Sequence, residues 1–206
     1  MDGLEGYLDR LASAEPTPGG GSAAAVVAAA GAALVAMVAR ITLGSARLAE
    51  RHPAAEVIAE QADALRAELL GTRLADESAY GEVVAAMALP KGSDEEKHAR
   101  TNALQRALAL AAAEPLRIAE LAGDAVALAE QALGLHNRNL VSDVGCAAEF
   151  AAAGLAAAAL NVRINHRYLK DATVVADQGA TLTTLERDTA ARLERLRECV
   201  QAEMKA

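Results

Sequence analysis

The stretch PTPGGGSAAAVVAAAGAALVAMVARITL, residues 16–43, decides the fold of this chain. A loop with three consecutive glycines, Gly19 to Gly21, leads into a run from Ser22 to Ala39 that contains no charged residue. A helix that is apolar on every side lies either in a protein core or in a membrane. The run is long enough to span a bilayer but consists mainly of alanine, so it predicts a buried helix that Ser22 caps and Gly44 ends.

The rest of the chain shows the same helical character. Apolar spacing and turn residues predict helices over residues 4–12, 53–88, 94–135 and 142–169, and from a cap at Asp171 to the C terminus. No segment alternates as a strand does. We therefore expect an all-α fold, an antiparallel bundle of long helices that forms one domain over residues 1–206. A lone bundle of this size rarely buries one helix completely, so the uncharged helix predicts a subunit interface and a homodimer.

Composition narrows the function classes. Hydrophobic residues make up 53% of the 206 residues but aromatic residues only 2%, which favours closely packed helices with small side chains. The net charge of −8 and the lack of a basic stripe argue against a nucleic-acid partner. The N terminus carries acidic residues and no early apolar block, so we expect no signal peptide and a cytoplasmic protein with no membrane partner.

The glycine run admits two interpretations. Three glycines before a helix let a ligand approach the backbone, and they point free N–H groups at a phosphate or a carboxylate. No lysine follows them, so the segment is not a P-loop. The alternative is a tight turn between packed helices in which only glycine fits, and spacing alone does not separate the two.

A second candidate is the pair Asp76 and Tyr80, which are four residues apart and share a helix face. A carboxylate beside a phenol suits general acid–base chemistry. The local pattern by itself favours the simpler interpretation, an exposed acidic stripe with Tyr80 partly in the core.

A third candidate is a set of polar residues around the helix that begins near residue 142. Asn161 and Asn165 lie one turn apart on an otherwise apolar helix, and buried amides must be hydrogen-bonded. They indicate either a network between helices or a polar pocket. The other members of the set precede these asparagines in the chain and are Asn137, Asn139, Ser142 and Asp143. Taken by itself, Asp143 is explained as a helix cap.

Histidines and cysteines add little. The four histidines show no metal-ligand spacing, and Cys146 is expected to be a small core residue. We therefore expect no metal site.

Taken together, the segments resemble the cyclodeaminase/cyclohydrolase family of folate enzymes. They follow the family's order over most of the chain, and the ordered set is specific although each segment alone is weak. The matching segments are Pro16–Ser22, Gly31–Leu34, Met37–Ala39, Asp76–Tyr80, Leu89–Lys91, Glu96–Lys97, Pro115–Leu116, Asn139–Gly145 and Asn161–Asn165. The chain departs from the family at Arg40, where asparagine is usual, and the basic-aromatic stretch after that helix is reduced to Ser45–Leu48.

The resemblance implies a helical homodimer that acts on one-carbon tetrahydrofolates, with no cofactor beyond the folate itself. One family activity hydrolyses 5,10-methenyltetrahydrofolate to the 10-formyl form, and the other closes formiminotetrahydrofolate to the methenyl form and releases ammonia. The chain shows no fused formiminotransferase domain, which favours the cyclohydrolase. The alternatives are the cyclodeaminase and a folate-binding helical protein without catalysis.

On this resemblance, Asp143 is the leading acid/base or cation-stabilising residue, and Asp76 with Tyr80 is the second acid–base candidate. The expected substrate-binding residues fall into three groups. The amides that would orient the pterin are Asn139, Asn161 and Asn165. The glycine run that would bind a polar part of the folate comprises Gly19, Gly20, Gly21 and Ser22. The cations that would meet the glutamate tail are Arg40, Lys91 and Arg163.

Overall fold

A computed structural model describes residues 3–205. Within this part of the chain the regular structure is entirely helical, with six α-helices and two short 3₁₀ helices. The elements are α1 (Leu4–Leu11), α2 (Gly20–Leu43), η1 (Ala46–Arg51), α3 (His52–Ala88), α4 (Asp94–Leu133), η2 (Arg138–Leu140), α5 (Val141–His166) and α6 (Ala172–Lys205). The all-α prediction is confirmed.

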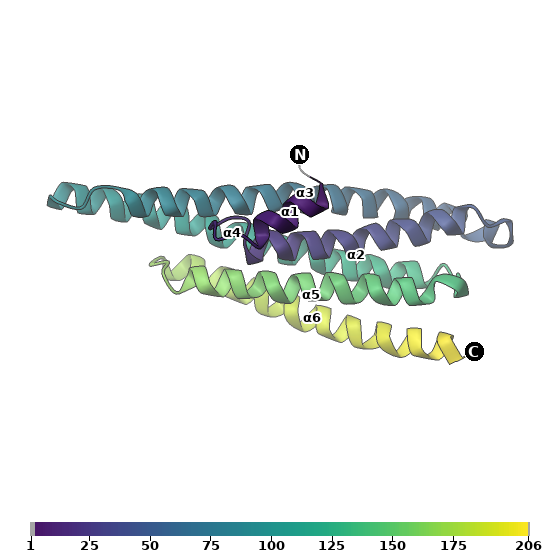
Figure 1. The fold of residues 1–206 in the computed structure, drawn as a ribbon. Coiled ribbons are helices and arrows are strands. Elements are labelled where there is room, and N and C mark those ends of the chain that lie inside the picture. Colours follow the sequence, from purple (N-terminus) through teal and green to yellow (C-terminus); the bar gives the residue numbers. More distant parts are fainter. Residues whose placement is uncertain (1–2, 206) are drawn as a thin grey trace.

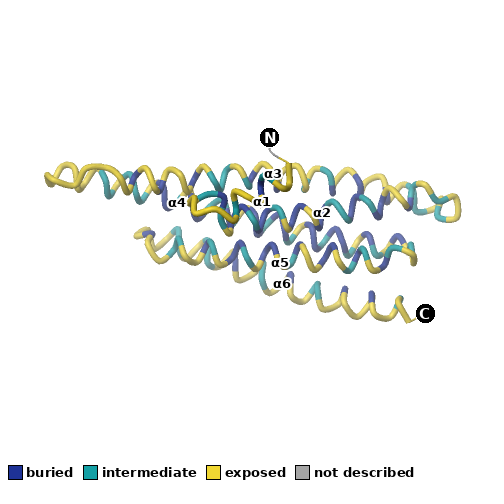
Figure 2. Tube along the Cα trace, viewed as in Figure 1, coloured by how far each residue is buried: buried dark blue, intermediate teal, exposed yellow. Residues whose placement is uncertain are grey.

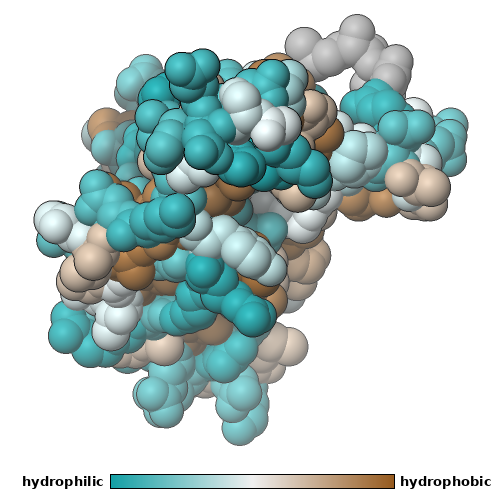
Figure 3. Space-filling model, turned by 90° about the vertical axis from the view of Figure 1, so that its left-hand side faces the viewer, coloured by the Kyte–Doolittle hydropathy of each residue, from teal (hydrophilic) through white to brown (hydrophobic). Residues whose placement is uncertain are grey.

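The core is an antiparallel arrangement of α2, α3, α4 and α5 (Figure 1). Helix α6 packs on α4 and α5. The short α1 lies against α2 and α3, where its Tyr7 contacts Ser22 and Arg73. The α3–α4 hairpin projects beyond the other helices at one end of the molecule. Hydrophilic residues cover most of that end, with apolar residues visible between the helices (Figure 3).

Small residues set the distance between α2 and α5. A Cβ on Gly31 would lie 2.7 Å from the carbonyl oxygen of Ala147, and a Cβ on Gly154 would lie 2.8 Å from the Cβ of Ala28. Both contacts are closer than real Cβ atoms allow. The two backbones approach as closely as they do because neither glycine carries a side chain.

Most expected helix boundaries lie within a few residues of the observed ones. Gly44 follows the last residue of α2 as predicted, and Asp171 accepts hydrogen bonds from the N–H groups of Thr173 and Val174 at 3.0 and 3.2 Å. The prediction that Ser22 caps α2 is wrong. The N-cap is Gly19, and the Ser22 hydroxyl donates instead to Oε1 of Glu77 at 2.7 Å, because Ser22 lies inside the first turn against α3.

Helix α2 is largely but not completely buried (Figure 2). Val27 and Ile41 remain 39% and 48% exposed on α2, and Phe150 and Leu160 remain 42% and 66% exposed on α5. Both helices are long and apolar enough to cross a membrane by length and composition, a test that core helices also pass. Here the buried residues of both helices belong to the hydrophobic core of the bundle. Cys146 is exposed on α5, which corrects the expectation of a core cysteine.

Candidate functional site

A pocket of about 240 Å³ lies where the N terminus of α2 meets α3, α4 and the C-terminal half of α5. Four separate segments of the chain supply its walls. The lining residues are Pro16, Thr17, Gly19, Gly20, Gly21, Asp76, Tyr80, Ala111, Asn161, Ile164 and Asn165. The structure thus brings together the glycine run, the Asp76–Tyr80 pair and the two asparagines of α5, which are distant in sequence.

The glycines allow other groups to reach the first turn of α2. A Cβ on Gly21 would stand 2.4 Å from Oδ1 of Asp76, and one on Gly20 would stand 3.3 Å from Nδ2 of Asn161. The backbone N–H of Ser22, in the same turn, donates to the Asp76 carboxylate. An acidic side chain from α3 therefore occupies the positive end of α2, where a carboxylate is electrostatically favoured.

Asp76 has the most informative electrostatics in the pocket. Burial raises the pKa of its carboxyl from 3.8 to about 6, the hydrogen bond from Ser22 opposes this rise, and the charges of Glu114 and Glu77 add to it. A carboxyl group with a pKa close to neutrality exchanges its proton readily at physiological pH, which is the requirement for a general acid–base group. Among the predicted site residues, Asp76 is therefore the one whose pKa suits it to proton transfer.

Tyr80 lies one helical turn after Asp76 and also lines the pocket. Its side chain is 45% exposed, so the phenol is accessible to a ligand and is not a core group. The carboxyl and the phenol can therefore contact the same bound molecule from one face of α3.

The asparagines present hydrogen-bond acceptors to the pocket. Nδ2 of Asn165 donates to the carbonyl oxygens of Ala111 and Asn161 at 2.6 and 2.9 Å, and Nδ2 of Asn161 donates to that of Ala157 at 2.9 Å. Because backbone carbonyls engage both amide nitrogens, the Oδ1 atoms remain available to a ligand. Together with Asp76, they make a pocket suited to a ligand edge rich in N–H donors.

Ser22 does not line the pocket. It is completely buried behind the glycine run and bonded to Glu77, which corrects its expected contact with the substrate. Its backbone N–H acts on the pocket through Asp76.

Asp143 does not share this pocket within one chain. It lies in the first turn of α5, and the 18 residues that separate it from Asn161 span about 27 Å of helix. Asn139 lies beside it in η2. The expectation that Asp143 and Asn139 stand next to Asn161 and Asn165 is therefore wrong for a single chain, because one straight helix places them at opposite ends of the bundle.

The three predicted cations also lie outside the pocket lining. Arg40, near the end of α2, pairs with Asp63, and Arg163, on α5, pairs with Glu186 at 2.6 Å. Lys91 is exposed in the turn between α3 and α4. Of the three cations, only Arg163 lies between two pocket residues, Asn161 and Asn165, in the sequence.

Sequence reasoning missed several wall residues. Pro16 and Thr17 were part of the recognised glycine motif but were not assigned to the site, whereas Ala111 and Ile164 are ordinary apolar positions of long helices. Only the tertiary packing of α4 and α5 distinguishes those two from their neighbours. Within residues 3–205, no group of three or more histidine, cysteine or acidic side chains is placed to hold a metal ion.

Comparison with known proteins gives one consistent result. The family model described as formiminotransferase-cyclodeaminase matches residues 3–184. A methenyltetrahydrofolate cyclohydrolase from Methylorubrum extorquens is 39% identical over 201 residues, which cover 98% of this chain and 97% of that protein. The formimidoyltransferase-cyclodeaminase of Rattus norvegicus is 34% identical over 82% of this chain, which corresponds to 31% of the rat protein.

A solved structure has the same fold. The formiminotetrahydrofolate cyclodeaminase of Thermotoga maritima superposes with a TM-score of 0.87 and 28% identity, over 98% of this chain and 96% of that one. The helical architecture, the ordered motifs and a family match over most of the sequence lead to one conclusion: the chain belongs to the formiminotransferase-cyclodeaminase family.

Proposed function

We propose that this protein is an enzyme of one-carbon tetrahydrofolate metabolism that hydrolyses 5,10-methenyltetrahydrofolate to 10-formyltetrahydrofolate. The full-length similarity to a methenyltetrahydrofolate cyclohydrolase supports this activity over the others in the family. The observation that carries the proposal is Asp76, a half-buried carboxyl with a pKa of about 6 that lines a pocket of hydrogen-bond acceptors.

The substrate's reactive group is a cationic carbon between two folate nitrogens. An anionic Asp76 stabilises that cation and accepts a proton from the attacking water, so that a hydroxyl adds to the carbon. The resulting tetrahedral carbon then breaks one of its two C–N bonds. Asp76 returns the proton to the departing nitrogen, the hydroxyl releases its remaining proton to solvent as its C–O bond becomes the formyl carbonyl, and the formyl group stays on the other nitrogen. Tyr80, on the same face of α3, holds the water or the new hydroxyl by a hydrogen bond.

The pterin would be held by the asparagines. Its amino group and ring N–H groups are donors, and the Oδ1 atoms of Asn161 and Asn165 are the free acceptors on that side of the pocket. The N–H groups of Gly19 to Gly21 would receive a polar part of the folate, and Arg163, at the α5 surface, would pair with the glutamate tail.

The second candidate is formiminotetrahydrofolate cyclodeaminase, which the likeness to the Thermotoga maritima enzyme favours. In that reaction one folate nitrogen attacks the formimino carbon and ammonia leaves. A protonated Asp76 would donate to the departing nitrogen, a role that also suits a pKa of about 6. The same pocket would therefore serve either reaction.

Spectrophotometry separates these proposals. Methenyltetrahydrofolate loses its absorbance on hydrolysis, so the purified protein should accelerate that loss over buffer, and Asp76→Asn should not. Formation of methenyltetrahydrofolate with release of ammonia from formiminotetrahydrofolate would instead identify a cyclodeaminase. Saturable binding of folate with turnover of neither substrate would leave a non-catalytic folate-binding protein and overturn both enzymatic proposals.

We also propose that the protein is a cytoplasmic homodimer. The support for a dimer is the uncovered apolar face of α2 and α5, which includes Val27, Ile41, Phe150 and Leu160. Several large apolar side chains exposed on two neighbouring helices are typical of an interaction site. Ile164 is 46% exposed near the end of this face and also lines the pocket, so a second copy would border the site.

A two-fold dimer offers Asp143 a route to the site. A second copy that packs across this face about a two-fold axis perpendicular to the helices presents its opposite end to the pocket. Asp143 of the partner subunit would then approach the pocket that Asp143 of the same chain cannot reach. This arrangement keeps the catalytic role expected for Asp143 and assigns it to the other protomer.

A further inference from the structure

Helix α1 is attached to the bundle mainly through one side chain. Leu4 and Leu8 are 67% and 50% exposed, and Tyr7 is the one buried residue of α1, with 7% exposure. An eight-residue helix is too short to be stable alone. What holds Tyr7 therefore also holds α1 and the start of the loop that follows it.

Tyr7 belongs to a closed ring of four side chains. The Ser22 hydroxyl donates to Oε1 of Glu77 at 2.7 Å, Arg73 Nη1 donates to the same oxygen at 3.0 Å, and the Arg73 guanidinium lies 5.1 Å from the centre of the Tyr7 ring. The Tyr7 hydroxyl lies 3.0 Å from Ser22 Oγ. Since Ser22 has one proton and gives it to Glu77, Tyr7 must be the donor of that last bond.

The ring and the pocket meet at two points. Ser22 gives its hydroxyl to the ring and its backbone N–H to Asp76, and Glu77 of the ring directly follows Asp76 on α3. The loop from α1 to α2 contributes Pro16 and Thr17 to the pocket wall. The ring therefore borders both the carboxyl of Asp76, through Ser22 and Glu77, and the loop part of the pocket wall, through α1.

We infer that Tyr7, Arg73 and Glu77 are positioning residues that hold the loop wall and the first turn of α2 against Asp76. The inference rests on the proposed role of Asp76 in folate chemistry. Tyr7 keeps α1 and the loop in place, and Glu77 fixes Ser22 by its hydroxyl. Arg73 neutralises Glu77 beside the catalytic carboxyl and stacks on Tyr7.

The charges within the ring act on Asp76 in a defined way. Glu77 from α3 and Glu114 from α4 repel the Asp76 anion, while α2 offers only the Ser22 N–H and α5 only the uncharged Asn161 and Asn165. With Arg73 removed, the charge of Glu77 is no longer compensated, so the Asp76 pKa should rise. With Glu77 made neutral, the pKa should fall. Two variants that open the same ring should thus shift Asp76 in opposite directions by roughly 0.5 to 1 unit.

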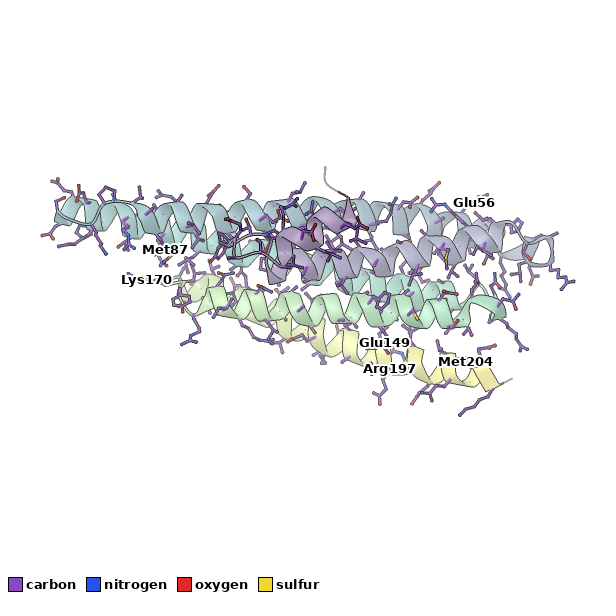
Figure 4. The ribbon with its side chains drawn as sticks, viewed as in Figure 1. Glu56, Met87, Glu149, Lys170, Arg197 and Met204 are labelled. Atoms are coloured by element: carbon purple, nitrogen blue, oxygen red, sulfur yellow. The ribbon has the colours of Figure 1, made fainter. Side chains whose placement is uncertain are left out.

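The test uses three ring variants of the full chain: Tyr7→Phe, Arg73→Met and Glu77→Gln. A matched control is Arg197→Met, which removes the ion pair with Glu149 that joins α5 to α6 away from the pocket (Figure 4). Hydrogen–deuterium exchange of residues 4–11 reports on α1, and the carboxyl ¹³C shift of labelled Asp76 reports its pKa. Neither readout needs turnover, so both remain informative if the proposed activity is absent.

We expect the amides of α1 to exchange faster than in the parent protein in all three ring variants and at the parent rate in the control. The Asp76 titration should move upward in Arg73→Met and downward in Glu77→Gln, and the acid limb of the kcat/KM profile should follow it. Tyr7→Phe, which changes no charge, should leave the titration in place and raise KM about two- to tenfold with a smaller effect on kcat.

Two results would overturn the inference. One is unchanged α1 exchange in Tyr7→Phe, the variant least able to disturb folding. The other is a titration of Asp76 that is unaltered, or that moves in the same direction in Arg73→Met and Glu77→Gln, since a merely structural ring would produce either pattern.

Discussion

Gly21 and Asp76 are so close that a Cβ on Gly21 would stand 2.4 Å from the nearer carboxylate oxygen. Gly21 lies on the first turn of α2 and Asp76 lies on α3. Because Gly21 has no side chain, the Asp76 carboxylate can reach the N terminus of α2. The glycine run therefore combines the two interpretations, the structural turn and the ligand loop. The glycines pack two helices closely, and the group that they admit is the proposed catalytic carboxyl.

Gly21→Ala should displace Asp76 and abolish most activity. The added Cβ would overlap the carboxylate of Asp76, so that side chain must leave its position against the first turn of α2, and overpacking of this kind costs about 1–3 kcal/mol of stability. Thermal unfolding and turnover are the measurements. Gly71→Ala, in α3 with open space around its Cβ, is the control and should gain roughly 0.5–1 kcal/mol because alanine favours helix. Full activity of Gly21→Ala would contradict the close contact.

Asp76→Asn should reduce turnover by about 10²–10⁴-fold, the usual contribution of a general acid–base group. In the unmodified enzyme, kcat/KM for hydrolysis should rise with pH through about 6, as the Asp76 carboxyl loses its proton. Stopped-flow absorbance over a pH series gives both quantities. A profile without an inflection near that pH would assign proton transfer to another group.

The same substitution should stabilise the folded chain at neutral pH. Folding raises the pKa of Asp76 from 3.8 to about 6, so the contribution of this carboxyl to stability is fully present below the lower value and is lost as the pH rises to the higher one. Asparagine avoids that loss while still accepting the Ser22 N–H. Asp76→Asn should therefore exceed the parent by roughly 1–2 kcal/mol at pH 7.5, allowing for solvent screening.

Denaturant unfolding across the pH range checks this prediction. The gap between Asp76→Asn and the parent should shrink toward zero as the pH falls to about 4. A constant gap would mean that packing, and not ionisation, separates the two proteins.

Leu160→Asp should break the proposed dimer. Leu160 is 66% exposed on the uncovered face of α5, and a charge there would be desolvated in the interface. Light scattering at micromolar concentration should report a dimer for the parent and a monomer for the variant. Met204→Asp, at an equally exposed site on the last turns of α6, is the control and should leave the mass unchanged. A monomeric parent protein would end the dimer proposal.

Asp143→Asn tests whether the other end of the bundle takes part in the reaction. We expect this variant and Asp76→Asn each to be inactive alone. Mixed in equal amounts after subunit exchange, they should recover on the order of a quarter of the parent activity, because half of the dimers are mixed and each of these holds one intact site. An unchanged rate for Asp143→Asn alone would remove Asp143 from the mechanism.

The sequence by itself determined the helical class and most helix boundaries. The uncharged alanine-rich run predicted a helix without competition from strands, and Asp171 was identifiable as a cap because capping depends on neighbouring residues alone. The residue types of the site were also visible, since glycines before a helix and amides on an apolar face are unusual wherever they occur.

Only the tertiary structure decided which of those residues meet. Asp143 and Asn161 share a helix and a motif pattern, yet a rise of about 1.5 Å per residue keeps them at opposite ends. Asp76 is joined to the glycine run by the packing of α3 on α2, and burial between those helices gives its carboxyl a pKa of about 6. Ser22 became a link in a buried ring instead of a helix cap because a Glu77 carboxylate from another helix lies within hydrogen-bond distance. Such contacts depend on distances across the bundle, which local sequence does not encode.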